Sequence, residues 1–176
     1  MKGKFVGPAI EHLQEKEEIY GDYFAETLDI SKSSASAMKN NKRTMGRETA
    51  QKAIQAFGDT APKFTMMLTR AFSNNQTAPV MDGLAVDVNN HLAMIMRLKK
   101  EITDVKEAIN INDMLRDPQH ATDNERNSIL NFLIEAREMD WYLDNTIATL
   151  IEAYGFNNDE VNDRVTRKMK SEGAIR

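Results

Sequence analysis

A turn between two short amphipathic segments, at residues 22–40, constrains the fold of this chain more than any other feature. Phe24, Ala25 and Leu28 fall on one face of the first segment, as the buried positions of a helix do. Ile30 follows at the corner, and Ser31 is a residue type that caps the start of a helix. The pattern therefore predicts two helices, over about 22–28 and 32–40, that meet at a tight turn.

The second of these helices presents two different faces. Ala35 and Met38 point inward together with Ile30. The outward positions hold small or hydrogen-bonding side chains: Lys32, Ser33, Ser36, Ala37 and Asn40. Such side chains let a helix approach the edges of bases closely. Lys39, Lys42 and Arg43 supply positive charge for phosphates at the end of the helix, so the stretch is typical of a helix that binds DNA.

Over about residues 10–72 the chain resembles the lambda-repressor-like helix-turn-helix family of phage and bacterial regulators. The matching positions are Ala25 where the helices cross, Ile30 in the turn, Ser31 at the cap, and the exit Asn40-Asn41-Lys42-Arg43. The resemblance implies base contacts from Lys32, Ser33, Ser36 and Ala37, and contacts to the DNA backbone from Asn40, Lys42 and Arg43.

Two positions depart from the glycines that the family usually has. Asp29 occupies the turn and Asn41 the exit, and both residue types tolerate the left-handed backbone conformation better than most. Further helices are expected over about 9–19, 46–57 and 61–72, which gives the five helices of such a domain. The polar segment 73–79 ends in proline and predicts a linker between domains at 1–75 and 80–176.

The second domain begins with apolar residues spaced by alternating threes and fours, which predicts a helix over about 81–109 that needs a partner helix. This stripe consists of Met81, Leu84, Val88, His91, Ile95, Leu98, Ile102, Val105 and Ile109. Residues 117–121 break the helix, and Thr122 to Glu125 form a capping-box pattern that opens another. Its stripe is Ile129, Leu133, Ala136, Leu143, Ile147, Leu150 and Tyr154, which ends at Gly155. The fold class is therefore all-α, with an antiparallel helical hairpin in the second half.

More apolar residues flank these stripes than one hairpin can cover. A second copy of the chain would close the surface as a four-helix bundle, so we expect a homodimer through residues 80–155. The expected dimer residues are Leu84, Val88, His91, Ile95, Leu98, Ile102, Val105, Leu133, Leu143, Ile147 and Leu150. The alternative is a groove for the helix of a protein partner such as an antirepressor, and both could hold.

The net charge of −4 is divided unevenly along the chain. Residues 1–75 carry a small excess of Lys and Arg, whereas residues 76–176 carry a larger excess of Asp and Glu. The basic residues expected near DNA are Lys32, Lys39, Lys42, Arg43, Arg47, Lys52 and Lys63. Nucleic-acid affinity depends on such a local basic face rather than on the total charge.

Catalytic and metal-binding patterns are missing from the sequence. His12, His91 and His120 are scattered, and no phosphate-binding Gly-rich loop occurs. Glu135 and Glu138 could share a metal, but their spacing fits a solvated helix face better. We expect neither enzyme activity, a cofactor nor a metal. No apolar run approaches the ~20 residues that span a bilayer, and the first residues lack the apolar core of a signal peptide, which favours a cytoplasmic location. The absence of cysteine excludes disulfides and thiolate metal sites.

The function expected from these features is that of a dimeric, sequence-specific regulator of transcription, a phage-type repressor bound to double-stranded operator DNA. A competing hypothesis is a protein-interaction module, such as an antirepressor or antitoxin, whose C-terminal helices bind a protein. A phage replication or packaging factor that uses the same DNA-binding fold is a third.

Overall fold

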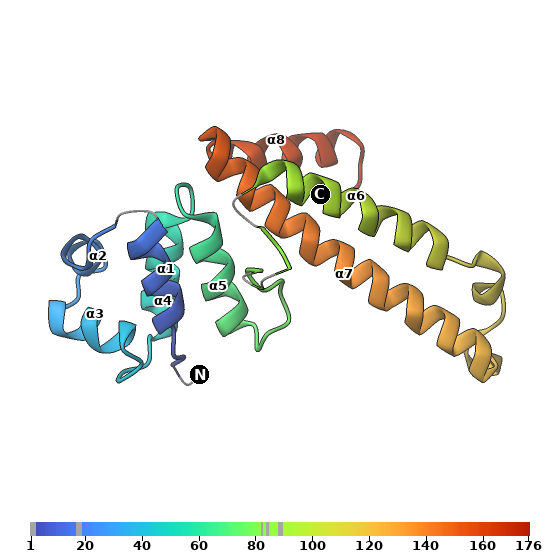
Figure 1. Cartoon of the computed structure of the whole chain (residues 1–176), viewed down its shortest axis with the longest axis horizontal. Coiled ribbons are helices and arrows are strands. Elements are labelled where there is room, and N and C mark those ends of the chain that lie inside the picture. The colour runs from blue at the N-terminus through green and yellow to red at the C-terminus, as the bar shows by residue number, and fades with distance from the viewer. Residues whose placement is uncertain (1–2, 17–18, 82, 84, 88–89) are drawn as a thin grey trace. The chain divides into compact units, whose positions relative to one another are not determined.

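The computed structural model shows a chain built from helices (Figure 1). It describes all residues except 1–2, 17–18, 82, 84 and 88–89. Among the described residues, β-type backbone pairing is limited to one isolated antiparallel bridge between Lys4 and Met45. The expected all-α class is thus confirmed. No described helix combines the length and apolarity needed to cross a membrane.

The chain divides into two compact units. One comprises Met1–Val80 together with Leu150–Arg176, and the other comprises Met81–Thr149. The first boundary lies close to the linker expected at 73–79. The domain boundaries predicted from the sequence, however, placed all of 80–176 in the second domain. The structure instead groups Leu150–Arg176 with the first unit.

The first unit contains the five helices expected from the sequence. Their bounds are α1 Gly7–Lys16, α2 Gly21–Thr27, α3 Lys32–Lys39, α4 Arg47–Phe57 and α5 Pro62–Phe72. Their apolar faces meet around three aromatic rings. Phe57 stacks on Phe24 at 5.8 Å between centroids, and Phe64 meets both rings edge-on. Ala25 and Ala53 are buried beside this cluster, where small side chains allow the helices to approach.

The segment Leu150–Arg176 joins this unit through polar contacts that sequence periodicity does not reveal. Lys63 on α5 is buried, and its Nζ lies 2.5 Å from the carboxylate of Glu152, in the last turn of α7 (Asp123–Tyr154). Helix α8 (Asn158–Ser171) begins beside the end of α4. There the Asp59 carboxylate raises the pKa of the Asp159 carboxyl by repulsion between the two charges.

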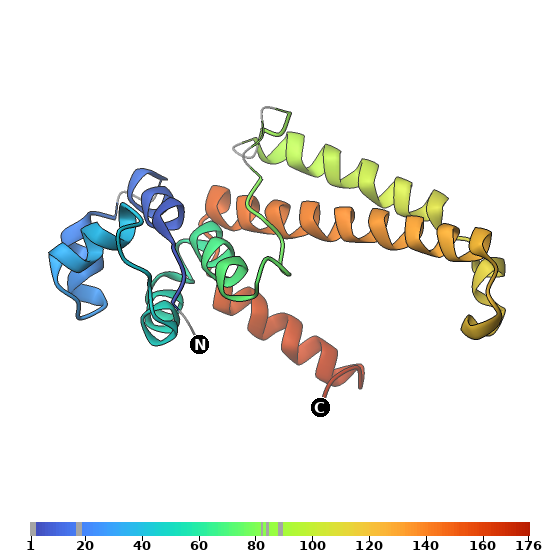
Figure 2. The same cartoon turned by 90° about the horizontal axis from the view of Figure 1, so that it is seen from below.

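The second unit is a pair of helices that run in opposite directions. Helices α6 (His91–Ala108) and α7 lie side by side in both views (Figure 1; Figure 2). Two short 3-10 turns, Ile111–Met114 and Pro118–His120, connect them. Helix α6 starts later than the stripe from Met81 predicted, because the Asn90 side chain caps it by accepting from the Ala93 N–H.

The expected cap of α7 is present. Thr122 and Glu125 bond reciprocally: the Thr122 N–H donates to the Glu125 carboxylate at 2.7 Å, and the Glu125 N–H donates to the Thr122 hydroxyl at 3.3 Å. Gly155 ends the helix with φ +65°, a left-handed conformation in which glycine is unstrained. Both ends of α7 predicted from the sequence, the capping box at Thr122 and the stop at Gly155, are thus confirmed.

Candidate nucleic-acid interface

The turn between α2 and α3 depends on a left-handed residue. Asp29 has φ +53°. This left-handed conformation was predicted because Asp29 stands where the resembled family usually has glycine. This conformation ends α2 and lets the Ile30 N–H donate back to the Ala25 carbonyl at 3.0 Å. Ala25 is buried and Ile30 is half-buried, so the corner packs against the core. The turn thus fixes the direction in which α3 leaves α2.

Ser31 starts α3 as a capping residue. Its hydroxyl accepts from the Ser34 N–H at 3.1 Å, while its backbone is extended. The cap satisfies one of the N–H groups that the first turn of a helix leaves without a partner. The hydroxyls of Ser33 and Ser34 lie 3.0 and 2.9 Å from that of Ser31, so a cluster of hydroxyl groups occupies the N-terminal end of α3.

The outer face of α3 carries the residues that the sequence predicted for it. Ala35 and Met38 are buried on the inner face. Ala37 is half-buried, and the remaining predicted contact residues are exposed: Lys32, Ser33, Ser36, Asn40, Lys42 and Arg43. These residues form what we call the α3 face. It combines small side chains, hydroxyl groups and an amide, which can approach and hydrogen-bond base edges in a groove.

The end of α3 is attached to the start of α1. Asn41 has φ +53°, and its side-chain oxygen accepts from the Gly7 N–H at 2.9 Å. A Cβ on Gly7 would lie 2.3 Å from the Lys39 carbonyl oxygen, so only glycine fits there. The left-handed conformation of Asn41 was predictable from the sequence, but this contact was not, since local spacing carries no signal for a partner elsewhere in the domain.

Positive charge on the α3 face is concentrated toward its C-terminal end. Lys32, at the other end, lies 2.5 Å from the Asp22 carboxylate, and both side chains are exposed. Lys39 donates to the Gln14 amide oxygen at 2.6 Å. The Arg43 guanidinium donates to the Ser34 hydroxyl at 2.9 Å, while Lys42 extends from the exit turn and is exposed.

One basic residue that the sequence expected near DNA is buried in the first unit. The sequence counted Lys63 with the cations near DNA, but this side chain is buried on α5 and paired with Glu152. A buried cation requires a counter-ion. Counting charges between residues 29 and 63 could not show that Glu152, far along the sequence, provides it. Lys63 therefore belongs to the structural core and not to the interface.

A carboxylate cluster occurs between α6 and α7. Glu101, Glu135 and Glu138 bring oxygens within 4.8 Å of one another. The sequence singled out the last two and missed Glu101, which comes from the other helix and is fully buried. Arg97 and Lys100 lie 2.8 and 3.7 Å from the Glu101 carboxylate. These cations offset the charge of Glu101, and Arg97 also lies 4.0 Å from Glu138, so the cluster is part of an ion-pair network.

The residues expected to form the dimer occupy varied positions. Leu84 and Val88 lie outside the described residues. His91, Ile95, Leu98 and Val105 are half-buried on α6, and Ile102 is exposed. Leu133, Leu143 and Ile147 are exposed on α7, whereas Leu150 belongs to the first unit and is half-buried. The fully buried residues of α6 are Met94 and Glu101, which the predicted stripe does not include, while Leu98 and Val105 of the stripe lie one helical turn from them and are half-buried.

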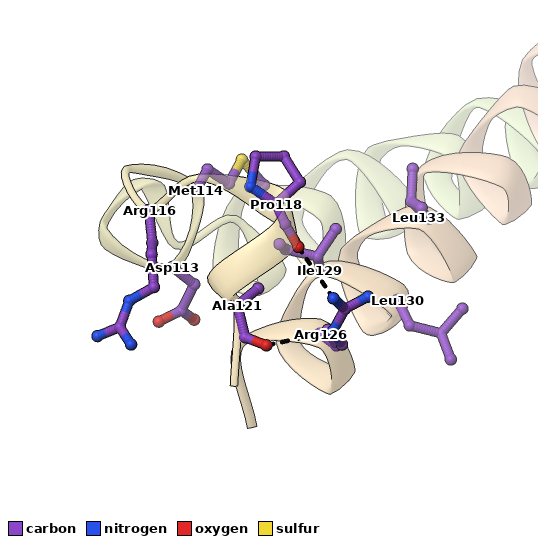
Figure 3. A pocket seen from close by; sticks show the side chains of 9 residues that line it. All are labelled: Asp113, Met114, Arg116, Pro118, Ala121, Arg126, Ile129, Leu130 and Leu133. Atoms are coloured by element: carbon purple, nitrogen blue, oxygen red, sulfur yellow. Dashed lines mark hydrogen bonds between the residues drawn. The ribbon is translucent and has the colours of Figure 1, made fainter. Parts of the chain in front are cut away.

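An apolar pocket of about 420 Å³ lies where α6 connects to α7 (Figure 3). Met114, Pro118, Ile129, Leu130 and Leu133 provide its apolar walls. Arg126 donates to the carbonyl oxygens of Pro118 and Ala121 across it, which holds the 3-10 turn against the start of α7. A second pocket of about 440 Å³ lies further along α7, and Leu133, Ile134 and Trp141 are among its lining residues.

No protein-family model, curated protein or solved structure matches this chain. The α3 face and the surfaces of the second unit are therefore the features that bear on function.

Proposed function

We propose that this chain is a sequence-specific DNA-binding regulator of transcription whose α3 face enters the major groove of its operator. The observation that carries the proposal is the division of α3 into a buried face and an exposed polar face, beyond a turn that fixes its direction. A helix-turn-helix presents its second helix to DNA in this way. The lambda-repressor-like resemblance of residues 10–72 leads to the same function.

The roles of the residues follow from their positions on α3. Lys32, Ser33 and Ser36 lie in the N-terminal part of the helix, which contacts base edges in a helix-turn-helix. Ala37 offers an apolar contact of the kind that a thymine methyl group accepts. Asn40, Lys42 and Arg43 at the exit contact phosphates, which fixes the register of the helix on the duplex.

The proposed regulator acts as a homodimer. Two copies would place their α3 helices in successive major grooves about 34 Å apart, on the two halves of an inverted repeat. Occupancy of such a site excludes RNA polymerase, so repression is the proposed outcome. The partners are double-stranded operator DNA and a second copy of the chain, and an antirepressor protein is a further candidate.

The experiment selects sequences from a random DNA pool with the full chain and then measures affinity by fluorescence anisotropy over a range of salt concentrations. An inverted repeat is expected. Lys42→Ala should weaken binding to all duplexes and reduce the slope of log affinity against log salt by about 1. Ser33→Ala should change the preferred sequence instead. Lys106→Ala, which removes an exposed lysine of the second unit, is the matched control and should change neither.

Equal affinity of the wild-type chain for the selected and a scrambled duplex at physiological salt would contradict sequence-specific binding. A selected single half-site would contradict the twofold arrangement but retain DNA recognition.

A protein-interaction role is the second candidate, and the exposed apolar residues of α7 favour it. Leu130, Leu133 and Ile134 are each more than half exposed beside the two pockets. A partner helix that inserted apolar side chains there would cover them. If Leu133→Glu abolishes regulation in cells while operator affinity is unchanged, this surface carries the function and DNA binding is secondary.

A further inference from the structure

Charged and polar side chains line part of the seam between α6 and α7. Arg97 extends from α6 over the Tyr142 ring at 5.1 Å and lies 4.0 Å from the Glu138 carboxylate. On α6 the fully buried side chains are Met94 and Glu101. On α7 the buried polar side chains are Asn145, Thr146 and Thr149. Charged and hydrogen-bonding groups thus share the contact between the two helices with apolar side chains such as Tyr142, and several members of the apolar stripes stay exposed.

The apolar stripes of α6 and α7 come together on one side of the pair. Successive residues of a helix differ by about 100° around its axis. In two antiparallel right-handed helices, the residue after each inward-facing position therefore points to the same side. On α6, Ile95 follows Met94 and Ile102 follows Glu101. On α7, Ala136, Met139 and Leu143 follow Glu135, Glu138 and Tyr142.

All of these following residues are apolar, so they define a continuous surface. We call it the two-helix face; its members are Ile95, Leu98, Ile102, Ala136, Met139, Leu143 and Ile147. Ile102, Leu143 and Ile147 remain 36%, 38% and 42% exposed in a single chain. We infer that this face binds the same face of a second copy of the chain and so forms a four-helix bundle. The inference names the dimer surface of the proposed regulator and depends on that proposed function.

Size and charge both favour a second copy as the occupant. Helix α6 has 18 residues, which gives a length of about 27 Å, and two adjacent helices are about 20 Å wide. The footprint is then about 500 Å² on each copy, and about 1,000 Å² in total is the lower size of a specific interface. The seven members of the two-helix face carry no charge, as is typical for the core of an interface, and Lys99 and Lys106 border the face one helical turn from Ile95 and Ile102.

The outer side of the pair provides controls. Met96 on α6 is 72% exposed and follows Ile95, so it lies away from the two-helix face. Leu133 lines both pockets on α7 and also lies away from this face. Both are apolar and exposed, so they match Ile102 and Leu143 in chemistry and differ in position.

The test measures the mass of the full chain by light scattering without DNA, over a range of protein concentrations. The wild type should have twice the monomer mass of 20.0 kDa. Ile102→Glu and Leu143→Glu should raise the dimer dissociation constant by at least about 30-fold, the effect of losing a central interface residue. Met96→Glu and Leu133→Glu should remain dimeric, and far-ultraviolet circular dichroism should be the same for all four.

Single-cysteine variants avoid the introduction of a charge and use the absence of natural cysteines. The thiol of Ile102→Cys should react more slowly with a maleimide as protein concentration rises, whereas Met96→Cys should react at a constant rate. The inference would be overturned if the wild type remained monomeric at protein concentrations about 100-fold above one micromolar. It would also be overturned if Leu133→Glu dissociated the dimer and Ile102→Glu did not. A dimer without operator affinity would refute DNA recognition but not the dimer surface, and a monomer that binds an operator would refute the homodimer and its surface but not DNA recognition.

Discussion

At the scale of single residues, two left-handed positions with the same φ have different roles. Asp29 and Asn41 both have φ +53°. The Asn41 side chain also accepts a hydrogen bond from the Gly7 N–H, where it caps α1. The sequence suggested that each residue stands in for a glycine. The structure shows that this equivalence holds for the backbone of Asn41 but not for its side chain.

Glycine substitutions separate the two roles. Asp29→Gly should increase the free energy of unfolding by about 1 kcal/mol, because glycine adopts the left-handed conformation without strain. Asn41→Gly should give no such gain, because the relief of strain is offset by the loss of the hydrogen bond to Gly7. Urea denaturation followed by circular dichroism measures both values, and equal stabilisation by the two variants would show that the Asn41 contact is unimportant.

At the scale of elements, helix ends were easier to predict than helix packing. The caps at Ser31 and Thr122 and the stop at Gly155 depend on neighbours within a few residues, so the sequence contains the whole signal. The inward face of α6 depends on how α7 packs, and the heptad pattern alone assigned it to Ile95 and Ile102 instead of Met94 and Glu101. The same spacing still identified a real apolar face, but that face lies beside the seam.

The capping box of α7 has a pH-dependent contribution. The N–H and hydroxyl of Thr122 and the charge of Arg116 hold the pKa of the Glu125 carboxyl below its usual value. A lowered folded-state pKa gives stability that is present above the unfolded pKa, near 4.5, and is lost as the pH falls through the folded value. Thr122→Ala removes the two hydroxyl bonds of the capping box but keeps the backbone N–H donor, and it should lower the melting temperature at pH 7.

Thermal denaturation at several pH values checks this dependence. The difference in melting temperature between wild type and Thr122→Ala should shrink below about pH 4. Thr103→Ala, within α6, is the control because the Thr103 hydroxyl donates to the Lys99 carbonyl and has no carboxylate partner in this contact. A pH-independent difference for Thr122→Ala would contradict the role of Glu125.

At the scale of the whole molecule, the first unit is assembled from both ends of the chain. The contact between Lys63 and Glu152 joins residues far apart in the sequence, and neither periodicity nor charge counting could reveal it. The number and positions of the first five helices were predictable, since each has its own apolar face and terminal signals. The return of Leu150–Arg176 was not, because it depends on tertiary pairing of isolated charges.

Removing one partner of this pair should destabilise the protein strongly. Glu152→Ala leaves Lys63 buried without its counter-ion and should cost about 3 kcal/mol of unfolding free energy. The double variant Lys63→Met with Glu152→Leu should recover most of that loss, because apolar side chains of similar volume carry no buried charge. Chemical denaturation of the three proteins measures the effect, and Arg164→Ala, in an exposed pair with Glu160, is the control expected to change little.

The pairing of Lys63 with Glu152 also bears on how such a gene can be recombined. An exchange that joined the codons for 1–80 to a foreign oligomerisation segment would deliver an ammonium group into an apolar interior with nothing to neutralise it. Viable hybrids should instead arise by replacing the internal stretch 81–149 while retaining both flanks, so that the interchangeable cassette lies in the middle of the reading frame.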